Sequence, residues 1–253
     1  MGGMGAVKSL HVPRRERALR TRLRVAEAAT DLFATAGYSA TTMEAVATRA
    51  GVAVQTVYFI FHTKPQLLVE AVQIAGGGNE GASDVMARSW IHDVIGAPDG
   101  ARRVALAIEH GSLIYQRLGP LWPTIVAALG EPEVRGAWDR IVEGRREGMR
   151  RIIELMASRH ELRAGLEPAL AADVLFGLHR HELYLAFTTE AGWTFDRYRA
   201  WTYVTLCQQL LPPDIATAAV RPGSRATADL EFGRALPEVA ALTSPYQAAP
   251  PEF

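Results

Sequence analysis

The sequence contains one cysteine, Cys207, among 253 residues, so no disulfide can form within the chain. This is typical of a protein that is kept in a reducing compartment. No stretch approaches the roughly 18 consecutive apolar residues of a membrane-spanning helix. The first twenty residues, MGGMGAVKSLHVPRRERALR, also lack the apolar core of a signal peptide. We therefore expect a cytoplasmic protein that has no membrane partner.

An excess of charge of either sign is also missing, because 27 basic side chains balance 27 acidic ones. The distribution is uneven: residues 1–70 carry nine basic and five acidic groups, and the net charge of this part is +4. A basic end on a neutral chain suggests a polyanion as the partner of that end alone. Proline is scarce except in residues 212–253, which hold seven of the 14 and show no sustained period. We expect a flexible tail there.

Apolar residues recur at helical spacing along most of the chain, and the alternating pattern of strands is absent. The length is ample for a hydrophobic core. We therefore expect an all-α protein. The predicted helices cover about residues 15–36, 43–50, 54–61, 64–75, 82–95, 101–118, 120–129, 132–159, 168–189 and 196–211.

The segment GVAVQTVYFIF, residues 51–61, can be a buried strand or the turn and second helix of a helix-turn-helix. The preceding segment decides between them, because Thr42 suits the N-cap of a short helix that a glycine then ends. On the following helix, Val57 and Phe61 are four residues apart and face inward. Gln55 then faces outward, where a glutamine can bind adenine through two hydrogen bonds. The pattern predicts a DNA-binding helix-turn-helix.

Residues from about 20 to 72 closely resemble the DNA-binding region of TetR-family transcriptional repressors. The motifs that carry the resemblance are A-x-x-L-F-x-x-x-G-Y, T-T, A-G-V, T-V-Y-x-x-F and K-x-x-L, in this order and without a gap. A looser similarity to the closing helices of one branch of that family covers REGMRRIIELMASRHELRAGLEPALAADVLFGLHRHELYLAF and GWTFDRYRAWTYVTLCQQLL. The resemblance implies an all-helical homodimer whose fourth helix links a DNA-binding head to a ligand-binding body.

The resemblance also implies two sets of DNA contacts. At the start of the second helix of the motif, three residues fall where family members touch bases and adjacent phosphates: Val54, Gln55 and Thr56. Three others fall where family members contact the phosphate backbone: Thr42, Tyr58 and Lys64. The sequence departs from the family pattern at two positions, since Ala53 replaces the serine that usually caps this helix and Ile60 replaces a frequent histidine.

Polar side chains on apolar helix faces are the candidates for an effector site in the body. Arg145 lies between Ile141 and Met149, four residues from each, on the inward face of its helix. We expect it either to meet a polar or anionic ligand group or to pair with a buried carboxylate, Glu109 or Glu182. The candidates together predict a mostly apolar cavity with a few polar anchors. They are His110, Tyr115, Trp122, Arg145, Met149, His179 and Tyr184.

The last two predicted helices carry more apolar surface than a monomer would expose. Pairing with the same helices of a second copy would bury this surface in a closed, two-fold interface. The family resemblance implies the same elements. The candidate interface residues are Leu170, Val174, Leu178, Leu185, Trp201, Thr205 and Leu206.

Patterns for catalysis and metal binding are missing. HRHE at residues 179–182 invites a metal site, but residues two apart on a helix point about 200° apart. His179 and His181 therefore cannot share one ion, and no HExxH is present. We expect no enzyme, no metal and no cofactor.

The sequence thus predicts a helix-turn-helix head on a larger helical body for ligand binding and dimerisation. The predicted function is a ligand-responsive transcriptional regulator, preferably a repressor. As a homodimer it would bind a palindromic operator in double-stranded DNA until a small, mostly apolar effector releases it. The alternative is a ligand-insensitive DNA-binding protein whose body only dimerises. The predicted parts are a flexible basic arm (1–14), the helix-turn-helix domain (15–62), the body (63–211) and the Pro-rich tail (212–253).

Overall fold

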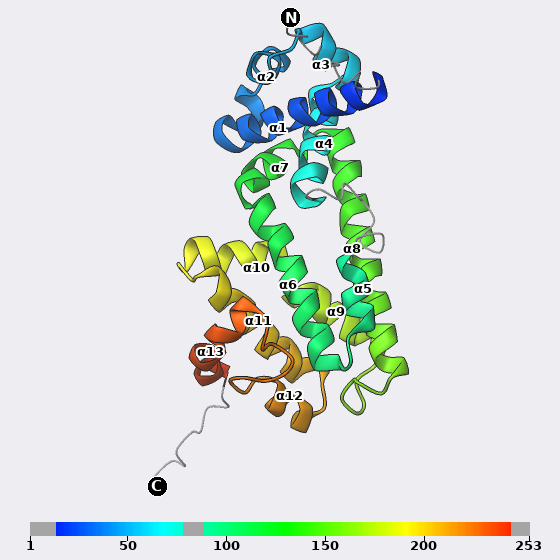
Figure 1. Cartoon of the computed structure of the whole chain (residues 1–253), viewed down its shortest axis with the longest axis vertical. Helices are drawn as coiled ribbons and strands as arrows, with labels where there is room; N and C mark the ends of the chain where they lie inside the picture. Colours follow the sequence, from blue (N-terminus) through cyan, green and yellow to red (C-terminus); the bar gives the residue numbers. More distant parts are fainter. Residues whose placement is uncertain (1–13, 78–88, 244–253) are drawn as a thin grey trace, which may run out of the picture. The chain divides into compact units, whose positions relative to one another are not determined.

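The structure, a computed structural model, describes residues 14–77 and 89–243. The basic arm expected at residues 1–14 lies outside this part except for its last residue, and so do the last ten residues of the tail. The described residues are helical and contain no strand, which confirms the predicted fold class (Figure 1). None of the described helices is both long and apolar enough to cross a membrane.

The chain forms two compact units. The first unit joins Met1–Ile74 to Leu121–Arg135, and the second joins Ala75–Pro120 to Gly136–Phe253. Two boundaries between the units fall inside helices, namely α4 (Lys64–Gly77) and α8 (Pro132–Ser158). The first unit thus holds more than the predicted helix-turn-helix domain.

The first unit is built on α1 (Arg14–Ala40), which packs against α2 (Met43–Ala50) and α7 (Trp122–Ala128) (Figure 1). The next helix, α3 (Val54–Phe61), packs on α2. The Thr124 hydroxyl of α7 donates a 2.6 Å hydrogen bond to the Phe33 carbonyl of α1. This bond and the packing make α7 part of the unit that carries the helix-turn-helix.

Local capping explains why α2 has the bounds predicted from the sequence. The Thr42 hydroxyl accepts a hydrogen bond from the Ala45 N–H at 3.1 Å, as an N-cap does. Gly51 ends α2 with a left-handed backbone (φ 64°), and its N–H donates to carbonyls of the last turn. At Ala53 no side chain caps α3, as the replaced serine implied. Gly37 (φ 79°) interrupts α1 where the sequence predicted its end.

In the second unit, α11 (Phe195–Leu210) packs against α6 (Gly100–Leu118) and α9 (Pro168–Leu178), and α6 also packs against α5 (Trp90–Gly96). A short 3₁₀ turn, η3 (Gly119–Leu121), follows α6. The core is aliphatic, but it also includes two fully buried arginines, Arg103 and Arg199. Arg103 donates to carbonyls at the end of α5 and to the carboxylate of Glu161.

The helix predicted over residues 168–189 is broken, which corrects the sequence analysis. After α9 the chain forms α10 (His181–Leu185) and then a π-helix, η4 (Ala186–Glu190). The backbone leaves helical geometry at His179 (φ −106°, ψ 81°), where the His179 carbonyl accepts a 2.8 Å hydrogen bond from the Tyr115 hydroxyl. The assumption that His179 and His181 lie on one continuous helix, from which we excluded a shared metal ion, is therefore wrong. The described residues contain no cluster of three or more His, Cys, Asp or Glu side chains suited to a metal ion.

The flexible tail predicted over residues 212–253 is also wrong for its described part. It forms α12 (Pro213–Ala219), a 3₁₀ segment η5 (Glu231–Ala235) and α13 (Leu236–Thr243), and all three pack on α11 (Figure 1). Pro213 occupies the first turn of α12, where its missing N–H needs no partner. Burial of Phe232, Leu236 and Val239 supplies the apolar contact that orders the segment.

Candidate nucleic-acid interface and effector site

The helix α3 has one buried and one exposed face. Val57 and Phe61 are buried inside the first unit and fix the rotation of the helix. Gln55 is exposed on the opposite face, and there Tyr58 is 45% and Phe59 82% exposed. Residues i, i+3 and i+4 share one face of a helix. The structure therefore brings these three side chains together on a single surface.

The other predicted DNA contacts lie around this surface. Val54 and Thr56, in the first turn of α3, are half-buried. The Tyr58 hydroxyl donates a long hydrogen bond of 3.4 Å to the Glu44 carboxylate in the first turn of α2. Thr42 is exposed at the start of α2. The surface thus combines polar, aromatic and hydroxyl groups of α2 and α3.

Phe59 was missed in the sequence analysis. It is the most exposed of the large apolar side chains described in this chain. Its position four residues after Gln55 was the available signal, because the same spacing that turns Gln55 outward does so for residue 59. An apolar ring this exposed has no role in the core of the first unit.

Lys64 is engaged inside the first unit. Its ammonium donates hydrogen bonds to the Tyr38 carbonyl at 2.6 Å and to the Ser39 carbonyl at 3.4 Å. It also lies 4.3 Å from the centre of the Tyr38 ring. The side chain therefore holds the start of α4 against the end of α1, where carbonyl groups lack helical partners.

The first turn of α4 is also bonded to the first turn of α8. The Thr63 hydroxyl accepts the Gln66 N–H at 3.2 Å, as the side chain of an N-cap does, and donates to the Glu133 carboxylate at 2.9 Å. The Gln66 side-chain amide donates to the same carboxylate at 3.4 Å. Burial, with Glu131 and Glu133 nearby, raises the pKa of Tyr38 to about 12. A carboxylate thus sits at the positive end of α4, a contact that the sequence analysis did not predict.

In the second unit, the structure gathers several of the predicted effector residues around Tyr115. The Tyr115 hydroxyl donates to the His179 carbonyl at 2.8 Å and accepts from the Arg145 guanidinium at 3.1 Å. The Ser112 hydroxyl lies 3.2 Å from the His179 ring nitrogen Nε2. The ring of Tyr184 lies 6.4 Å from that of Tyr115, centre to centre. We call these five residues and His181, whose ring lies 5.6 Å from that of Tyr115, the Tyr115 cluster.

Burial governs the charge of the histidines in the Tyr115 cluster. It lowers the pKa of His179 to about 3, and the nearby positive charge of Arg145 adds to this effect. Burial likewise lowers the pKa of His181 to about 4. Both rings are therefore neutral near pH 7.

Three predicted effector residues lie apart from the Tyr115 cluster. His110 stacks on Trp90 at a ring distance of 5.2 Å. Trp122 begins α7 and so belongs to the first unit. Met149 is buried in the core of the second unit.

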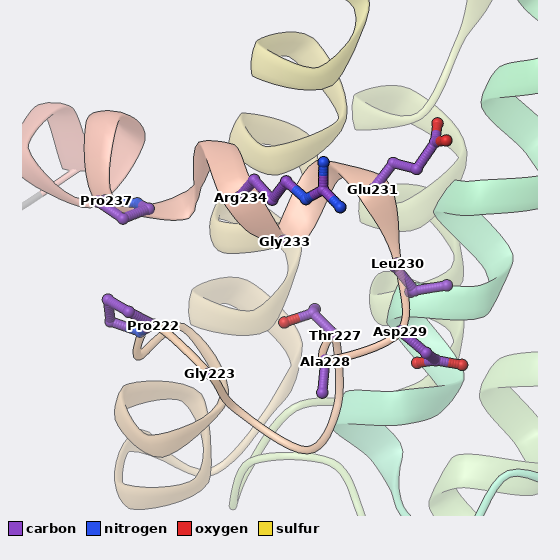
Figure 2. A pocket seen from close by; sticks show the side chains of 10 residues that line it. All are labelled: Pro222, Gly223, Thr227, Ala228, Asp229, Leu230, Glu231, Gly233, Arg234 and Pro237. Atoms are coloured by element: carbon purple, nitrogen blue, oxygen red, sulfur yellow. The ribbon is translucent and has the colours of Figure 1, made fainter.

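Two surface pockets lie at the C-terminal segment. The first, of about 490 Å³, is lined by the loop before η5, by η5 itself and by the start of α13 (Figure 2). The second, of about 510 Å³, is lined by His110 together with residues of α5, α6 and the same loop. None of the other predicted effector residues lines either pocket.

The predicted dimer residues differ in exposure. Leu170 on α9 is 57% exposed, whereas Leu206 is fully buried inside its own protomer. The prediction for Leu206 is therefore wrong, because the C-terminal segment and the neighbouring helices enclose α11 on most sides. Trp201 is half-buried against Phe187, with the ring centres 4.5 Å apart. The remaining residues are half-buried: Val174, Leu178, Leu185 and Thr205.

Comparison with known proteins identifies the head. Residues 25–71 match the model of the tetR family of bacterial regulatory proteins. The match covers the helix-turn-helix with parts of α1 and α4. No curated protein matches the chain in sequence. The chain has a TetR-type fold, with a helix-turn-helix head and a helical body.

Solved structures of TetR-family regulators share the fold. A protein from Mesorhizobium loti assigned to this family is 24% identical, with a TM-score of 0.59, and the match covers 77% of this chain and 98% of that one. A second neighbour is NalD, the secondary repressor of the MexAB-OprM multidrug efflux pump in Pseudomonas aeruginosa. It is 19% identical, with a TM-score of 0.58, and the match covers 78% of this chain and 99% of NalD. A third neighbour is SmeT in complex with triclosan. It is 20% identical, with a TM-score of 0.58, and the match covers 78% of this chain and 94% of SmeT.

Proposed function

We propose that this protein is a transcriptional repressor that binds a palindromic operator as a homodimer and releases it when a small, mostly apolar molecule occupies the second unit. The main support is the exposed face of α3, where Gln55, Tyr58 and Phe59 lie together on a helix held by buried residues. Support for ligand control comes from SmeT, a structural neighbour solved with triclosan.

Each group on the exposed face has a matching partner on duplex DNA. The Gln55 amide suits the paired donor and acceptor of adenine in the major groove, and the Phe59 ring suits a thymine methyl group. The hydroxyls of Tyr58 and Thr42 suit phosphate oxygens, which position the head without reading the sequence. The Lys64 ammonium has a third N–H for a phosphate beyond its two carbonyl bonds.

A dimer places two copies of α3 on one face of the DNA. Two half-sites must then lie about 34–36 Å apart, or a multiple of this, to match the helical repeat. We propose α9 and α11 as the interface, because Leu170 is exposed and Val174, Trp201 and Thr205 are half-buried.

The contact of Glu133 with Thr63 and Gln66 supports a route for ligand control. The helix that carries Glu133, α8, continues into the second unit, and so does α4. A ligand that shifts α8 would therefore alter the bonds at the start of α4, next to the head. A coupling of about 1–3 kcal/mol would weaken operator binding by about 5–150-fold.

The DNA-binding part is tested by titrating an operator duplex, selected from random DNA, with three variants. We expect Gln55→Ala and Phe59→Ala each to weaken operator binding by about 5- to 150-fold, since good base contacts contribute about 1–3 kcal/mol. The control is Val126→Ala on α7, which removes another exposed apolar side chain of the first unit. Equal affinity of all three variants for the operator would contradict the proposal.

The ligand-control part has a separate test. Any compound that raises the melting temperature of the protein should lower its operator affinity, and Glu133→Gln should reduce that effect while compound binding persists. If operator affinity is indifferent to every compound that binds, the ligand-insensitive alternative replaces this part of the proposal.

A further inference from the structure

Arg145 lacks the carboxylate partner that the sequence led us to consider. Within the described residues, no carboxylate oxygen lies within 4.0 Å of its guanidinium. Of the two candidates, Glu109 is bonded to Arg199 at 2.6 Å. Glu182 is held by Arg180 through two bonds of 2.8 and 2.5 Å. The charge of Arg145 is therefore not neutralised by a direct ion pair.

The two fully buried arginines provide an internal comparison. Arg103 contacts the Glu161 carboxylate at 3.1 and 3.3 Å, and Arg199 contacts the carboxylates of Glu109 and Asp196. Such pairing is expected, because a charge withdrawn from water without a counter-ion is costly. Arg145 is half-buried, and yet its closest partners are neutral.

Those partners are a hydroxyl and a ring. The Arg145 guanidinium donates to the Tyr115 hydroxyl at 3.1 Å and lies 4.4 Å from the centre of the Phe176 ring. The two histidines of the Tyr115 cluster are neutral near pH 7, so they neither add to the charge of Arg145 nor balance it. The direct contacts of the Arg145 guanidinium are thus neutral, although Arg146 lies over the same Phe176 ring. The hydrogen bonds from Arg180 and, more weakly, the charge of Arg145 lower the pKa of Glu182.

Irregular backbone lies beside this cation. The break between α9 and α10 is at His179, and the π-helix η4 follows α10 directly. A π-helical turn inside a helical segment often marks a functional site. The close approach of His179 to α6 also depends on Gly111, because a Cβ atom there would lie 2.3 Å from the His179 ring.

We propose that Arg145 binds the carboxylate of an effector whose apolar body packs against the half-buried rings of Phe176 and Tyr184. A planar guanidinium binds a carboxylate through two parallel hydrogen bonds, which gives both strength and orientation. This inference rests on the proposed role of the second unit as the effector-binding unit. It narrows the effector to a small organic acid.

The test uses two carboxylates, decanoate and 1-naphthoate, with decanol and 1-naphthalenemethanol as neutral counterparts. Binding to the full chain is measured by the shift in melting temperature and by calorimetric titration. We expect the wild type to bind each acid at least about tenfold more tightly than its alcohol, since hydrogen bonds to charged groups are the stronger class. Arg145→Met should abolish this preference, and Arg145→Lys should keep part of it.

Arg146→Met is the matched control. Arg146 is the next residue on α8 and lies 4.5 Å from the centre of the same Phe176 ring, but it is exposed and pairs with Asp173 at 3.4 Å. We expect this variant to keep the preference for acids. Without any probe, Arg145→Met should melt close to the wild-type temperature, because the loss of one hydrogen bond and one ring contact is offset by the removal of a half-buried charge that has no direct counter-ion.

The inference would be overturned if the wild type bound acids and alcohols equally, or if it bound neither acid. It would also be overturned if Arg145→Met and Arg146→Met lost the preference for acids to the same extent. A marked fall in the melting temperature of probe-free Arg145→Met would assign the arginine a structural role instead. Operator binding is measured on the same samples without probe. Intact operator binding beside a failed acid preference rejects this inference alone, whereas lost operator binding in the wild type rejects the proposed function.

Discussion

Substitution of Lys64 by methionine separates a structural role of this residue from its role on DNA. The ammonium donates to the Tyr38 carbonyl at 2.6 Å and lies 4.3 Å from the Tyr38 ring centre. A hydrogen bond from a charged group contributes about 1.5–3 kcal/mol, and a cation–π contact at a partly exposed site about 0.5–1 kcal/mol. One ammonium makes both contacts, so the terms are not additive. We expect Lys64→Met to lower the free energy of unfolding by about 2 kcal/mol.

The assay is thermal unfolding of the DNA-free protein. A loss of about 2 kcal/mol corresponds to a melting temperature about 4–8 °C lower for a protein of this size. Arg24→Met is the control, because Arg24 is an exposed cation of the same unit for which no ion pair is found within the described residues. It should melt like the wild type. A Lys64→Met protein that also melts like the wild type would refute the anchoring role, and a salt slope of DNA binding reduced by about one would then assign Lys64 to a phosphate alone.

Three further predictions concern stability. Ala53→Ser should raise the free energy of unfolding by about 1 kcal/mol by supplying the missing cap of α3; no gain in thermal unfolding would show that the first turn is satisfied otherwise. Phe232→Ala should cost about 3–5 kcal/mol in urea unfolding, because its ring is fully buried; a loss below about 1 kcal/mol would mean that the C-terminal segment is only loosely attached. The pKa of His181 is about 6.5 in the unfolded chain and about 4 in the folded protein. The stabilisation that the folded protein gains from a neutral His181 is therefore fully present above pH 6.5 and is lost as the pH falls toward 4. Between pH 7 and 5 the free energy of unfolding should fall by about 2 kcal/mol more in the wild type than in His181→Phe. If this free energy depends on pH in the same way in both proteins, the low pKa is contradicted.

The helix-turn-helix could be predicted to the residue because its signals are local. A threonine cap, a glycine in left-handed geometry and a spacing of four between Val57 and Phe61 fix both helices within 20 residues of sequence. The exposed positions of Gln55 and Tyr58 follow from the same spacing. The contact of these side chains with DNA stays a prediction, because the structure contains the protein alone.

The break after α9 could not be predicted, because the apolar pattern continues through it. The causes are distant in sequence: the Tyr115 hydroxyl bonded to the His179 carbonyl, and Gly111, which leaves room for the His179 ring. The pairing of Glu109 with Arg199 is likewise a tertiary contact over 90 positions. Because of this pairing, Glu109 is bonded to Arg199 and not to Arg145, for which the sequence analysis considered it.

The order in the C-terminal segment was missed for a similar reason. A proline-rich stretch without periodicity predicts a flexible chain, but Pro213 stands in the first turn of a helix, where proline is favoured. The segment has too few apolar residues to form a core alone. It gains order by placing Phe232, Leu236 and Val239 against α11, which local patterns do not reveal.

The central claim, specific binding of an operator through α3, is tested most directly by selecting bound sequences from a random pool of double-stranded DNA. The wild type should enrich a palindrome whose half-sites lie one helical turn or a multiple of it apart. Gln55→Ala should enrich a motif with relaxed preference at particular positions of each half-site. Recovery of no motif by the wild type at moderate salt would contradict the claim.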